Sequence, residues 1–457
     1  LTLGPDPVDS DKMNDSSKTV VPGIAKVGLA TAIAIVVANM IGVGVFGSLG
    51  FQVAGIPSGF PIMLLWLIGG LVSFCGAVCY AELASMFPKS GGEYHLLSRS
   101  WNPFIGFLAG WLSVTVGFAA PVAANASLLG GYLGEITGKA PAWFSIPVVL
   151  LITLIHLGKL SNIGLFQSGF TYAKVALILV LGGLGFLIGT AQPISFLPVE
   201  GDGDLIASSS FAISLVYVLY AYTGWNAATY MMDEVKHPEK TVPLALLIGT
   251  LIVTVLYLFI NAAFLYSTPI PDMAGKPEVG LVAAQSILGP RGGIIMGILI
   301  SFGLISTISS MTWAGPRVTA AIGRDHRHFR FLSRRNQNGV PALAVIIQAI
   351  IVIFLVYRAT FSQLIHYVQA LLTISSLMVV IGLILLRIRH PEMPRPYRAW
   401  GYPITPLIFA GVSLYVLRFQ ILEMPREFCY GLATLAVGAV VYLLFARRGV
   451  EANQKDS

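Results

Sequence analysis

The sequence predicts an all-α integral membrane protein with twelve transmembrane helices, and three observations lead to this prediction. Apolar residues make up 56% of the 457 residues and charged residues only 11%, whereas soluble domains carry about 25% charged residues. Apolar runs long enough to cross a bilayer as helices recur along the whole chain. Two of these runs are interrupted by glycine and polar residues at matching depths, which is typical of an inverted repeat.

The apolar runs define the predicted helices in chain order. They lie at 27–56, 61–87, 102–135, 141–158, 163–190, 208–236, 242–267, 292–316, 341–357, 362–388, 404–422 and 427–446. We expect helices throughout, because a transmembrane barrel shows alternating segments of about ten residues instead. The loops between the runs are too short to hold a soluble domain.

The ends of the chain are polar, and the domain organisation follows from the runs between them. The N-terminal stretch has no apolar segment of the kind found in a cleavable signal peptide, and Met13 could be the native start, with residues 1–12 added ahead of it. We expect a disordered tail at 1–21, a first repeat of five spans at 22–191, a second at 208–388, two further spans at 404–446 and a cytoplasmic tail at 447–457.

The positive charges predict the orientation in the membrane. Most of the 28 Lys and Arg residues lie on one side of the predicted helices, and this is the side of both termini. Because cytoplasmic loops carry an excess of Lys and Arg, both termini are expected in the cytoplasm and the protein in the cell (inner) membrane. The basic stretch "RDHRHFRFLSRR" (324–335) is then an ordinary cytoplasmic loop, and we expect no nucleic-acid partner.

The two interrupted runs are the strongest indication of function. The first run breaks at "IGVGVF" (41–46), and the sixth breaks about as far in, at "YAYTGWNAATY" (220–230). A break frees backbone N–H and C=O groups at the bilayer midplane, which is tolerable only where they line a cavity or bind something. Half-helix N-termini attract a carboxylate and freed carbonyls attract a cation, so two facing breaks suit an α-amino acid. The alternative is that these glycines only allow close helix packing.

Several motifs are similar to those of a known family. "MIGVGVFGS", "YAELASMFPKSGGEYHLLSR" (80–99), "YAYTGWNAATYMMDEVKHPEKTVPLAL" and "AGPRVTAAIGRD" resemble motifs of the amino acid–polyamine–organocation superfamily of transporters, closest to its L-type amino acid transporters and their bacterial relatives. The resemblance covers about residues 22–445. It implies the LeuT-type fold, a 5+5 inverted repeat with broken helices 1 and 6, which agrees with the pattern of breaks.

The resemblance also implies which residues bind the substrate. In family members the first break holds the substrate carboxylate on backbone amides, carbonyls of the sixth span receive the ammonium, and an aromatic residue there closes over the substrate from outside. That aromatic residue corresponds to Tyr220. The implied substrate-binding residues are Ile41, Gly42, Val43, Gly44, Tyr220, Ala221, Tyr222, Thr223 and Asn226. Val43 is a departure, because many L-type members have Ser or Thr there.

Lys174 is the one Lys or Arg that we place deep inside a predicted helix, too far from its end for the side chain to reach the interface. A buried lysine is costly unless it has partners or loses its proton. The resemblance implies that its ammonium replaces the sodium ion of sodium-coupled relatives, with Tyr257 coupled to it. We expect it to bond carbonyls of the first span and a hydroxyl of the eighth, Ser306 or Ser309.

The walls of the predicted pocket indicate the substrate class. The helices that would surround it carry hydroxyls and amides but no acidic or basic side chain at midplane depth. A cationic substrate would need a buried carboxylate, so we expect a sodium-independent exchanger or proton-linked symporter of neutral L-amino acids. A cationic amino acid or polyamine transporter of the same superfamily is the alternative, and a channel is a more remote one. No enzyme motif is present, and we expect no cofactor and no metal.

The expected partners are the small-molecule substrate and the lipid bilayer. Eukaryotic light chains of the resembling family carry an extracellular cysteine between spans 3 and 4 that ties them to a heavy subunit. The corresponding stretch here, "TGKAPAW" (137–143), has no cysteine. We therefore expect no heavy-chain subunit, and a monomer or weak homo-oligomer.

Overall fold

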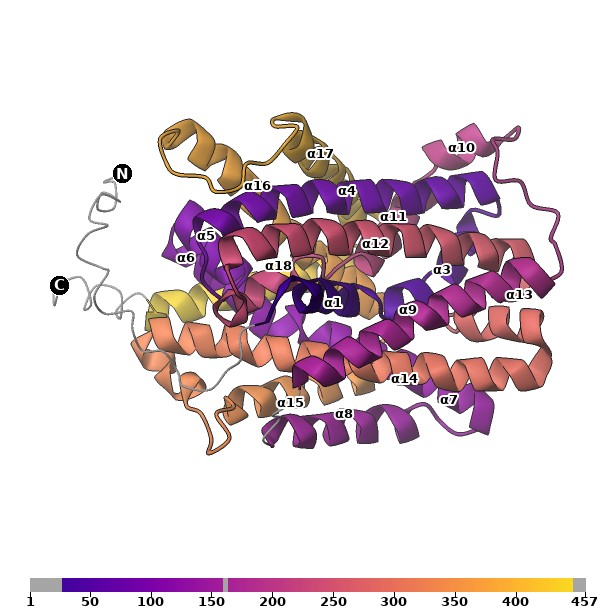
Figure 1. Cartoon of the computed structure of the whole chain (residues 1–457), viewed down its shortest axis with the longest axis horizontal. Helices are drawn as coiled ribbons and strands as arrows, with labels where there is room; N and C mark the ends of the chain where they lie inside the picture. Colours follow the sequence, from indigo (N-terminus) through magenta and orange to yellow (C-terminus); the bar gives the residue numbers. More distant parts are fainter. Residues whose placement is uncertain (1–26, 159–162, 447–457) are drawn as a thin grey trace.

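The structure is a computed structural model that describes residues 27–158 and 163–446. The predicted tails at 1–21 and 447–457 lie outside these residues. In the described part of the chain the regular structure is helical, and the extended pairing is confined to one isolated bridge between Val27 and Val235. Figure 1 shows the helices running side by side along the longest axis of the molecule.

The helices follow the apolar runs of the sequence. Those of the first half are α1 (Leu29–Met40), α2 (Val43–Gly47), α3 (Leu49–Gly55), α4 (Gly59–Met86), α5 (Glu93–Ser100), α6 (Pro103–Leu112), the π-helical η1 (Ser113–Gly117), α7 (Ala119–Thr137), α8 (Ala142–Leu157) and α9 (Ile163–Ile188). Those of the second half are α10 (Asp202–Ala207), α11 (Ser209–Ala221), the 3-10 helix η2 (Ala227–Glu234), α12 (Pro238–Ser267), α13 (Ile270–Met273), α14 (Val279–Asp325), the 3-10 helix η3 (Arg327–Ser333), α15 (Ala342–Arg358), α16 (Phe361–Arg389), α17 (Ile404–Glu423), α18 (Pro425–Val441) and the π-helical η4 (Tyr442–Ala446).

Each of the twelve predicted runs lies on helix. Among the described residues, nine helices are long and apolar enough to cross a membrane, and three shorter apolar helices, α8, α11 and α15, accompany them. Two runs differ in detail from the prediction. The third contains the π-helical turn η1, and the eighth is part of the much longer α14, which bends at Gly289, where φ is 72°.

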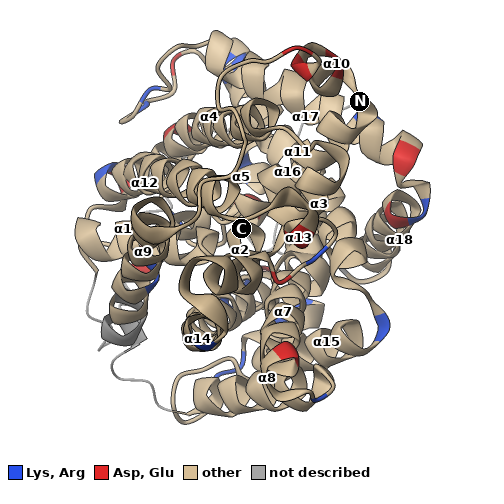
Figure 2. Ribbon diagram, turned by 90° about the vertical axis from the view of Figure 1, so that its right-hand side faces the viewer, with Lys and Arg blue, Asp and Glu red and all other residues tan. Residues whose placement is uncertain are grey.

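The outside of the bundle is apolar. Large side chains such as Trp143 (72% exposed), Tyr357 (78%) and Leu187 (82%) point outward, which a soluble protein would avoid over so wide a surface. Figure 2 looks along the helices and shows few charged residues among them. These exposed side chains are therefore suited to contact with lipid.

The two predicted breaks are present. Ile41 and Gly42 separate α1 from α2, and residues 222–226 separate α11 from η2. The two broken segments lie side by side and run in opposite directions. Gly55 lies near Ser210 at one end, and Gly44 packs on Ala221 in the middle. The broken segments therefore bring their interruptions together inside the bundle.

Candidate functional site

The break after α1 exposes three carbonyl oxygens that the helix would otherwise have paired. Ile41 adopts φ −73° and ψ 101°, and Gly42 adopts an extended backbone, so the hydrogen-bond ladder of the helix stops there. The freed oxygens belong to Ala38, Met40 and Ile41, and side chains from three other helices bond them. Side chains of the surrounding helices therefore satisfy the backbone at break 1, as we call Ile41 and Gly42.

Lys174 of α9 supplies the charged partner. It is 2% exposed, and its Nζ donates to the carbonyl oxygens of Ala38 (3.1 Å) and Ile41 (2.9 Å) and to Oγ1 of Thr307 (2.6 Å). Thr307 Oγ1 in turn lies 2.9 Å from the Ile41 oxygen. Three oxygen ligands around one positive charge form the kind of cage that a hard cation such as sodium prefers.

The hydroxyl that meets Lys174 is therefore that of Thr307 and not of Ser306 or Ser309. Neighbouring residues on a helix point in different directions, so the hydroxyls of Ser306, Thr307 and Ser309 cannot all face α9. Ser309 Oγ lies 2.9 Å from Nε2 of His156 on α8. Ser306 Oγ is buried and has no hydrogen-bond partner among the described residues.

Tyr257 of α12 connects the two breaks. Its hydroxyl lies 2.6 Å from the carbonyl oxygen of Met40, directly before break 1, and 3.0 Å from that of Ala221, where α11 ends. The ring is fully buried and packs edge-on against Trp66. A movement of either break would therefore change a hydrogen bond of this one side chain.

The break after α11, residues 222–226, is held by its own backbone and by close packing on α1. Gly224 has φ 98°, and a Cβ there would lie 2.8 Å from the backbone oxygen of Asn39. A Cβ on Gly44 would lie only 2.3 Å from Cα of Ala221. Glycine at these two positions lets the backbones touch. The amide of Val43, which we expected to bind a carboxylate, donates to Oδ1 of Asn125 (3.0 Å).

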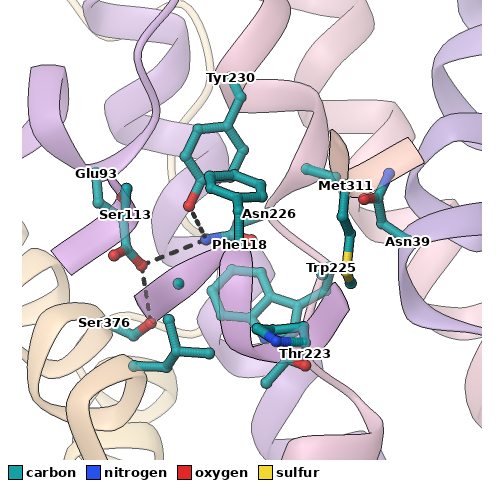
Figure 3. A pocket seen from close by; sticks show the side chains of 15 residues that line it. Asn39, Glu93, Ser113, Phe118, Thr223, Trp225, Asn226, Tyr230, Met311 and Ser376 are labelled. Carbon is teal, nitrogen blue, oxygen red and sulfur yellow. Dashed lines mark hydrogen bonds between the residues drawn. The ribbon is translucent and has the colours of Figure 1, made fainter. Parts of the chain in front are cut away.

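A cavity lies beside break 2, as we call residues 222–226, on the side of α5 and η2. Figure 3 shows its polar wall, where Glu93, Asn226 and Tyr230 are linked by hydrogen bonds, and the opposite wall with Met311. The residues that line it are Asn39, Glu93, Ser113, Gly117, Phe118, Pro121, Thr223, Gly224, Trp225, Asn226, Ala227, Tyr230, Met311, Leu372 and Ser376. One polar and one apolar wall suit a small amphipathic solute.

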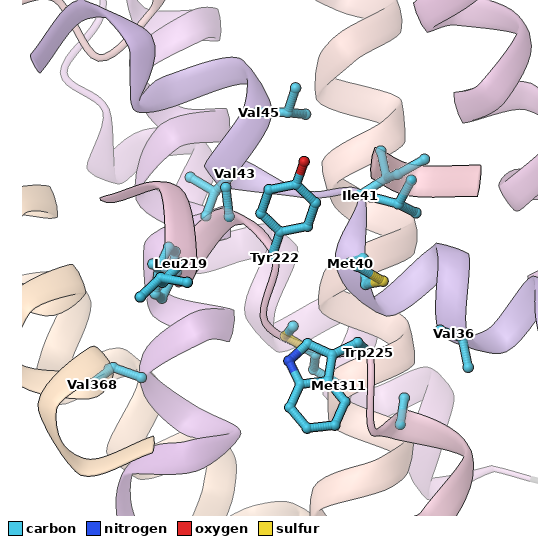
Figure 4. Close-up of a cluster of buried hydrophobic side chains, with 14 of the residues drawn as sticks. Val36, Met40, Ile41, Val43, Val45, Leu219, Tyr222, Trp225, Met311 and Val368 are labelled. Carbon is cyan, nitrogen blue, oxygen red and sulfur yellow. The ribbon is translucent and has the colours of Figure 1, made fainter. Parts of the chain in front are cut away.

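Two of the nine expected substrate-binding residues, Thr223 and Asn226, line this cavity. The other seven do not line it and are buried at or directly beside the two breaks. They are Ile41, Gly42, Val43, Gly44, Tyr220, Ala221 and Tyr222. Figure 4 shows Tyr222 among the apolar side chains around break 1, and its hydroxyl donates to the carbonyl oxygen of Trp66 (3.0 Å).

Glu93 is the cavity residue that sequence reasoning missed, since we expected no acidic side chain there. It is 3% exposed. Its Oε1 accepts hydrogen bonds from Tyr80 Oη (2.5 Å), Ser376 Oγ (3.0 Å) and Asn226 Nδ2 (3.3 Å), and its Oε2 accepts one from Ser375 Oγ. Burial raises the pKa of Glu93, and the hydrogen bonds from Ser375, Tyr80 and Ser376 oppose that rise.

Two glycines explain how a residue outside the apolar runs reaches the cavity. Gly91 and Gly92 have φ values of 134° and 54°, which turn the chain back toward the bundle after α4. A Cβ on Gly92 would lie 2.1 Å from the ring of Tyr230. The glycine pair directly before the acidic residue in "SGGEY" was the available signal.

The chain matches a known family over most of its length. A family model described as amino acid permease matches residues 27–443. The b(0,+)-type amino acid transporter 1 of Mus musculus is 26% identical, over 96% of this chain and 91% of the mouse protein. The serine/threonine exchanger SteT of Bacillus subtilis (strain 168) is 27% identical, over 86% of this chain and 90% of the bacterial protein.

A third relative, the large neutral amino acids transporter small subunit 2 of Oryctolagus cuniculus, is 25% identical over 92% of this chain and 80% of its own. The match to the family model includes both breaks, Lys174, Tyr257 and Glu93. The chain therefore belongs to the amino acid permease family of the amino acid–polyamine–organocation superfamily, and it is a membrane transporter of amino acids rather than an enzyme.

Proposed function

We propose that this protein is a sodium-independent secondary transporter of neutral L-amino acids that works by alternating access in the cell membrane. In this proposal it has twelve spans, arranged as two inverted repeats of five and two extra helices, and both termini are cytoplasmic. It needs no heavy-chain subunit and acts as a monomer or weak homo-oligomer. The observation that carries the proposal is the position of Lys174 at break 1.

Sodium independence is supported by the three contacts of Lys174. Its ammonium meets two backbone carbonyls and the Thr307 hydroxyl, a set of oxygens that would otherwise coordinate a cation. When protonated, the lysine supplies a positive charge from the chain itself, so no ion has to bind before break 1 is complete. The cage ties α9, break 1 and α14 together, as a bound sodium ion would.

The hydrogen bonds of Glu93 support a preference for neutral substrates. Both of its carboxyl oxygens accept hydrogen bonds from neighbouring side chains, and no other charged residue lines the cavity within the described residues. A cationic side chain would have to displace one of these donors. The relative from Bacillus subtilis is named as an exchanger of serine and threonine, which are neutral.

Alternating access is supported by the difference between the two sides of the breaks. On the side of α3, the rings of Phe51, Tyr217 and Phe361 are stacked, with centroids 5.2 Å and 5.8 Å apart. On the side of α5 lies the cavity. In this proposal Tyr220 closes over the substrate from the stacked side. The structure then corresponds to a state closed to the outside.

A transporter of cationic amino acids is the second candidate, and one observation favours it. Glu93 is an acidic side chain in the wall of the cavity, and if it is ionised it would attract a cationic substrate. The two candidates differ in the charge that they assign to Glu93, and competition between substrates distinguishes them.

The test is uptake by the purified protein in liposomes. Labelled alanine, serine, leucine and arginine are offered with sodium or choline outside, and with or without amino acid inside. The proposal predicts saturable uptake of the neutral substrates that choline does not reduce. Inhibition of alanine uptake by arginine at similar concentrations would favour the cationic candidate. Linear, non-saturable flux would indicate a channel.

A further inference from the structure

Two buried glutamates near the same end of the bundle have opposite surroundings. Glu82 of α4 accepts hydrogen bonds from the guanidinium groups of Arg387 (3.0 and 2.5 Å) and Arg395 (3.1 Å) and from the amide of Ala399 (2.6 Å). These groups can only donate, and two of them are cations. Glu82 is thus surrounded by fixed donors, two of them positively charged.

Glu93 is surrounded mainly by hydroxyl groups. Three of its four partners are Tyr80, Ser375 and Ser376, and the fourth is the amide of Asn226. A hydroxyl can donate to a carboxylate or accept from a carboxylic acid by turning its hydrogen alone. The same arrangement of heavy atoms therefore holds Glu93 with or without a proton.

Among the described residues, no Lys or Arg side chain bonds Glu93. Besides Tyr80, the ionisable group that faces it is Tyr230 of η2, whose hydroxyl shares the Asn226 amide with it. The described residues of α6 carry no ionisable side chain, η1 contributes Ser113, and α16 contributes two serines. On α5 itself, burial and two nearby basic residues lower the pKa of His95 to about 4, so His95 is neutral at ordinary pH.

The partners of Glu93 also connect it to a part of the molecule that should move. Tyr80 belongs to α4 and the serines to α16, whereas Asn226 belongs to break 2. A carboxylate accepts the Asn226 hydrogen bond more strongly than a neutral acid does. Loss or gain of one proton would therefore change how firmly break 2 is held to α5.

We propose that Glu93 is a proton-binding site of this transporter, and that it binds and releases one proton as water gains and loses access to the cavity during amino acid transport. The inference rests on the proposed function. When Glu93 is buried, desolvation favours the protonated acid. When water fills the cavity, the carboxyl of Glu93 is no longer desolvated, and it releases the proton to the water. Uptake then depends on pH.

The transport test compares three proteins in liposomes: the wild type, Glu93→Gln and the control Glu278→Gln. Glu278 is a partly buried carboxyl before α14 whose pKa burial also raises, but it does not line the cavity. Alanine uptake is measured from mildly acidic to mildly alkaline pH. We expect a pH-dependent rate with the wild type and Glu278→Gln, and loss of that dependence with Glu93→Gln. A flat wild-type profile, or an unchanged profile in Glu93→Gln, would overturn the proposal.

A second measurement needs neither transport nor the folding of Glu93→Gln. The infrared band of protonated carboxyl groups is titrated in the purified wild type and in Ser376→Ala, which removes one hydroxyl from Glu93. We expect a band that disappears with rising pH in the wild type and whose midpoint shifts in Ser376→Ala but not in Glu278→Gln. The absence of such a band would overturn the proton site. A titrating band in a protein that transports no amino acid would instead contradict the proposed function and leave the proton site supported.

Discussion

The two breaks differ in what their freed backbone groups meet. Break 1 is two residues long. Lys174 and Thr307 bond the carbonyl of Ile41, and Tyr257 bonds that of Met40 directly before the break. Break 2 is five residues long, and part of it faces the cavity. Break 1 is held by the side chain of Lys174 from a neighbouring helix, whereas break 2 can contact a solute in the cavity. From this comparison we propose that break 1 stays fixed during transport and that break 2 moves against it.

The largest expected effect comes from removing the charge at break 1. Lys174→Ala leaves two carbonyls and a hydroxyl without their cation. Because hydrogen bonds to charged groups contribute about 1.5–3 kcal/mol, transport should fall about 10-fold to 100-fold. The rate of alanine exchange in liposomes measures this. Lys139→Ala, at an exposed position, is the matched control. Normal exchange by Lys174→Ala would show that the lysine only fills space and has no role in transport.

Separating the two breaks should have the next largest effect. In Gly44→Ala the new Cβ would lie 2.3 Å from Cα of Ala221, so the backbones must move apart. We expect an exchange rate lower by about tenfold, with a lower melting temperature, since overpacking costs about 1–3 kcal/mol. Gly183→Ala on α9 is the control, because nothing lies within 4 Å of that position. If both variants behave alike, the contact between the breaks has no special role.

The link between the breaks should have a smaller effect. Tyr257→Phe keeps the ring and removes the hydroxyl that meets Met40 and Ala221. A neutral hydrogen bond contributes about 0.5–1.5 kcal/mol, so the maximal rate should fall about 2-fold to 10-fold with little change in stability. Tyr172→Phe, on the exposed side of α9, serves as the comparison. A change in affinity without a change in rate would contradict a role as a link.

The smallest expected effect concerns break 2. Asn226→Ala removes a side chain that lines the cavity and bonds Glu93 at 3.3 Å, a long hydrogen bond. We expect the apparent affinity for alanine to fall about 2-fold to 5-fold, because both hydrogen bonds of the Asn226 amide, to Glu93 and Tyr230, are long. Competition with unlabelled alanine measures it. If Asn226→Ala impairs the maximal rate more than Tyr257→Phe does, the assignment of fixed and moving breaks is reversed.

Much of this arrangement could be predicted from sequence, because it follows from local chemistry in an apolar chain. Glycine and polar residues inside long apolar runs marked both breaks. The depth of Lys174 showed that it needs partners, and the family resemblance implied that these are carbonyls. We expected Ser306 or Ser309 of α14 beside Lys174, whereas the hydroxyl there is that of Thr307, because the side that faces α9 depends on the rotation of α14. Glu93 was missed because two glycines fold a loop residue back into the bundle, a long-range packing effect.

The central claim is that the ammonium of Lys174 takes the place of a metal cation at break 1. It is tested most directly by alanine exchange in liposomes with sodium or choline as the only added cation, for the wild type and Lys174→Ala. The account predicts equal wild-type rates in the two salts and a large loss in Lys174→Ala under both. A wild-type rate that collapses in choline would contradict it.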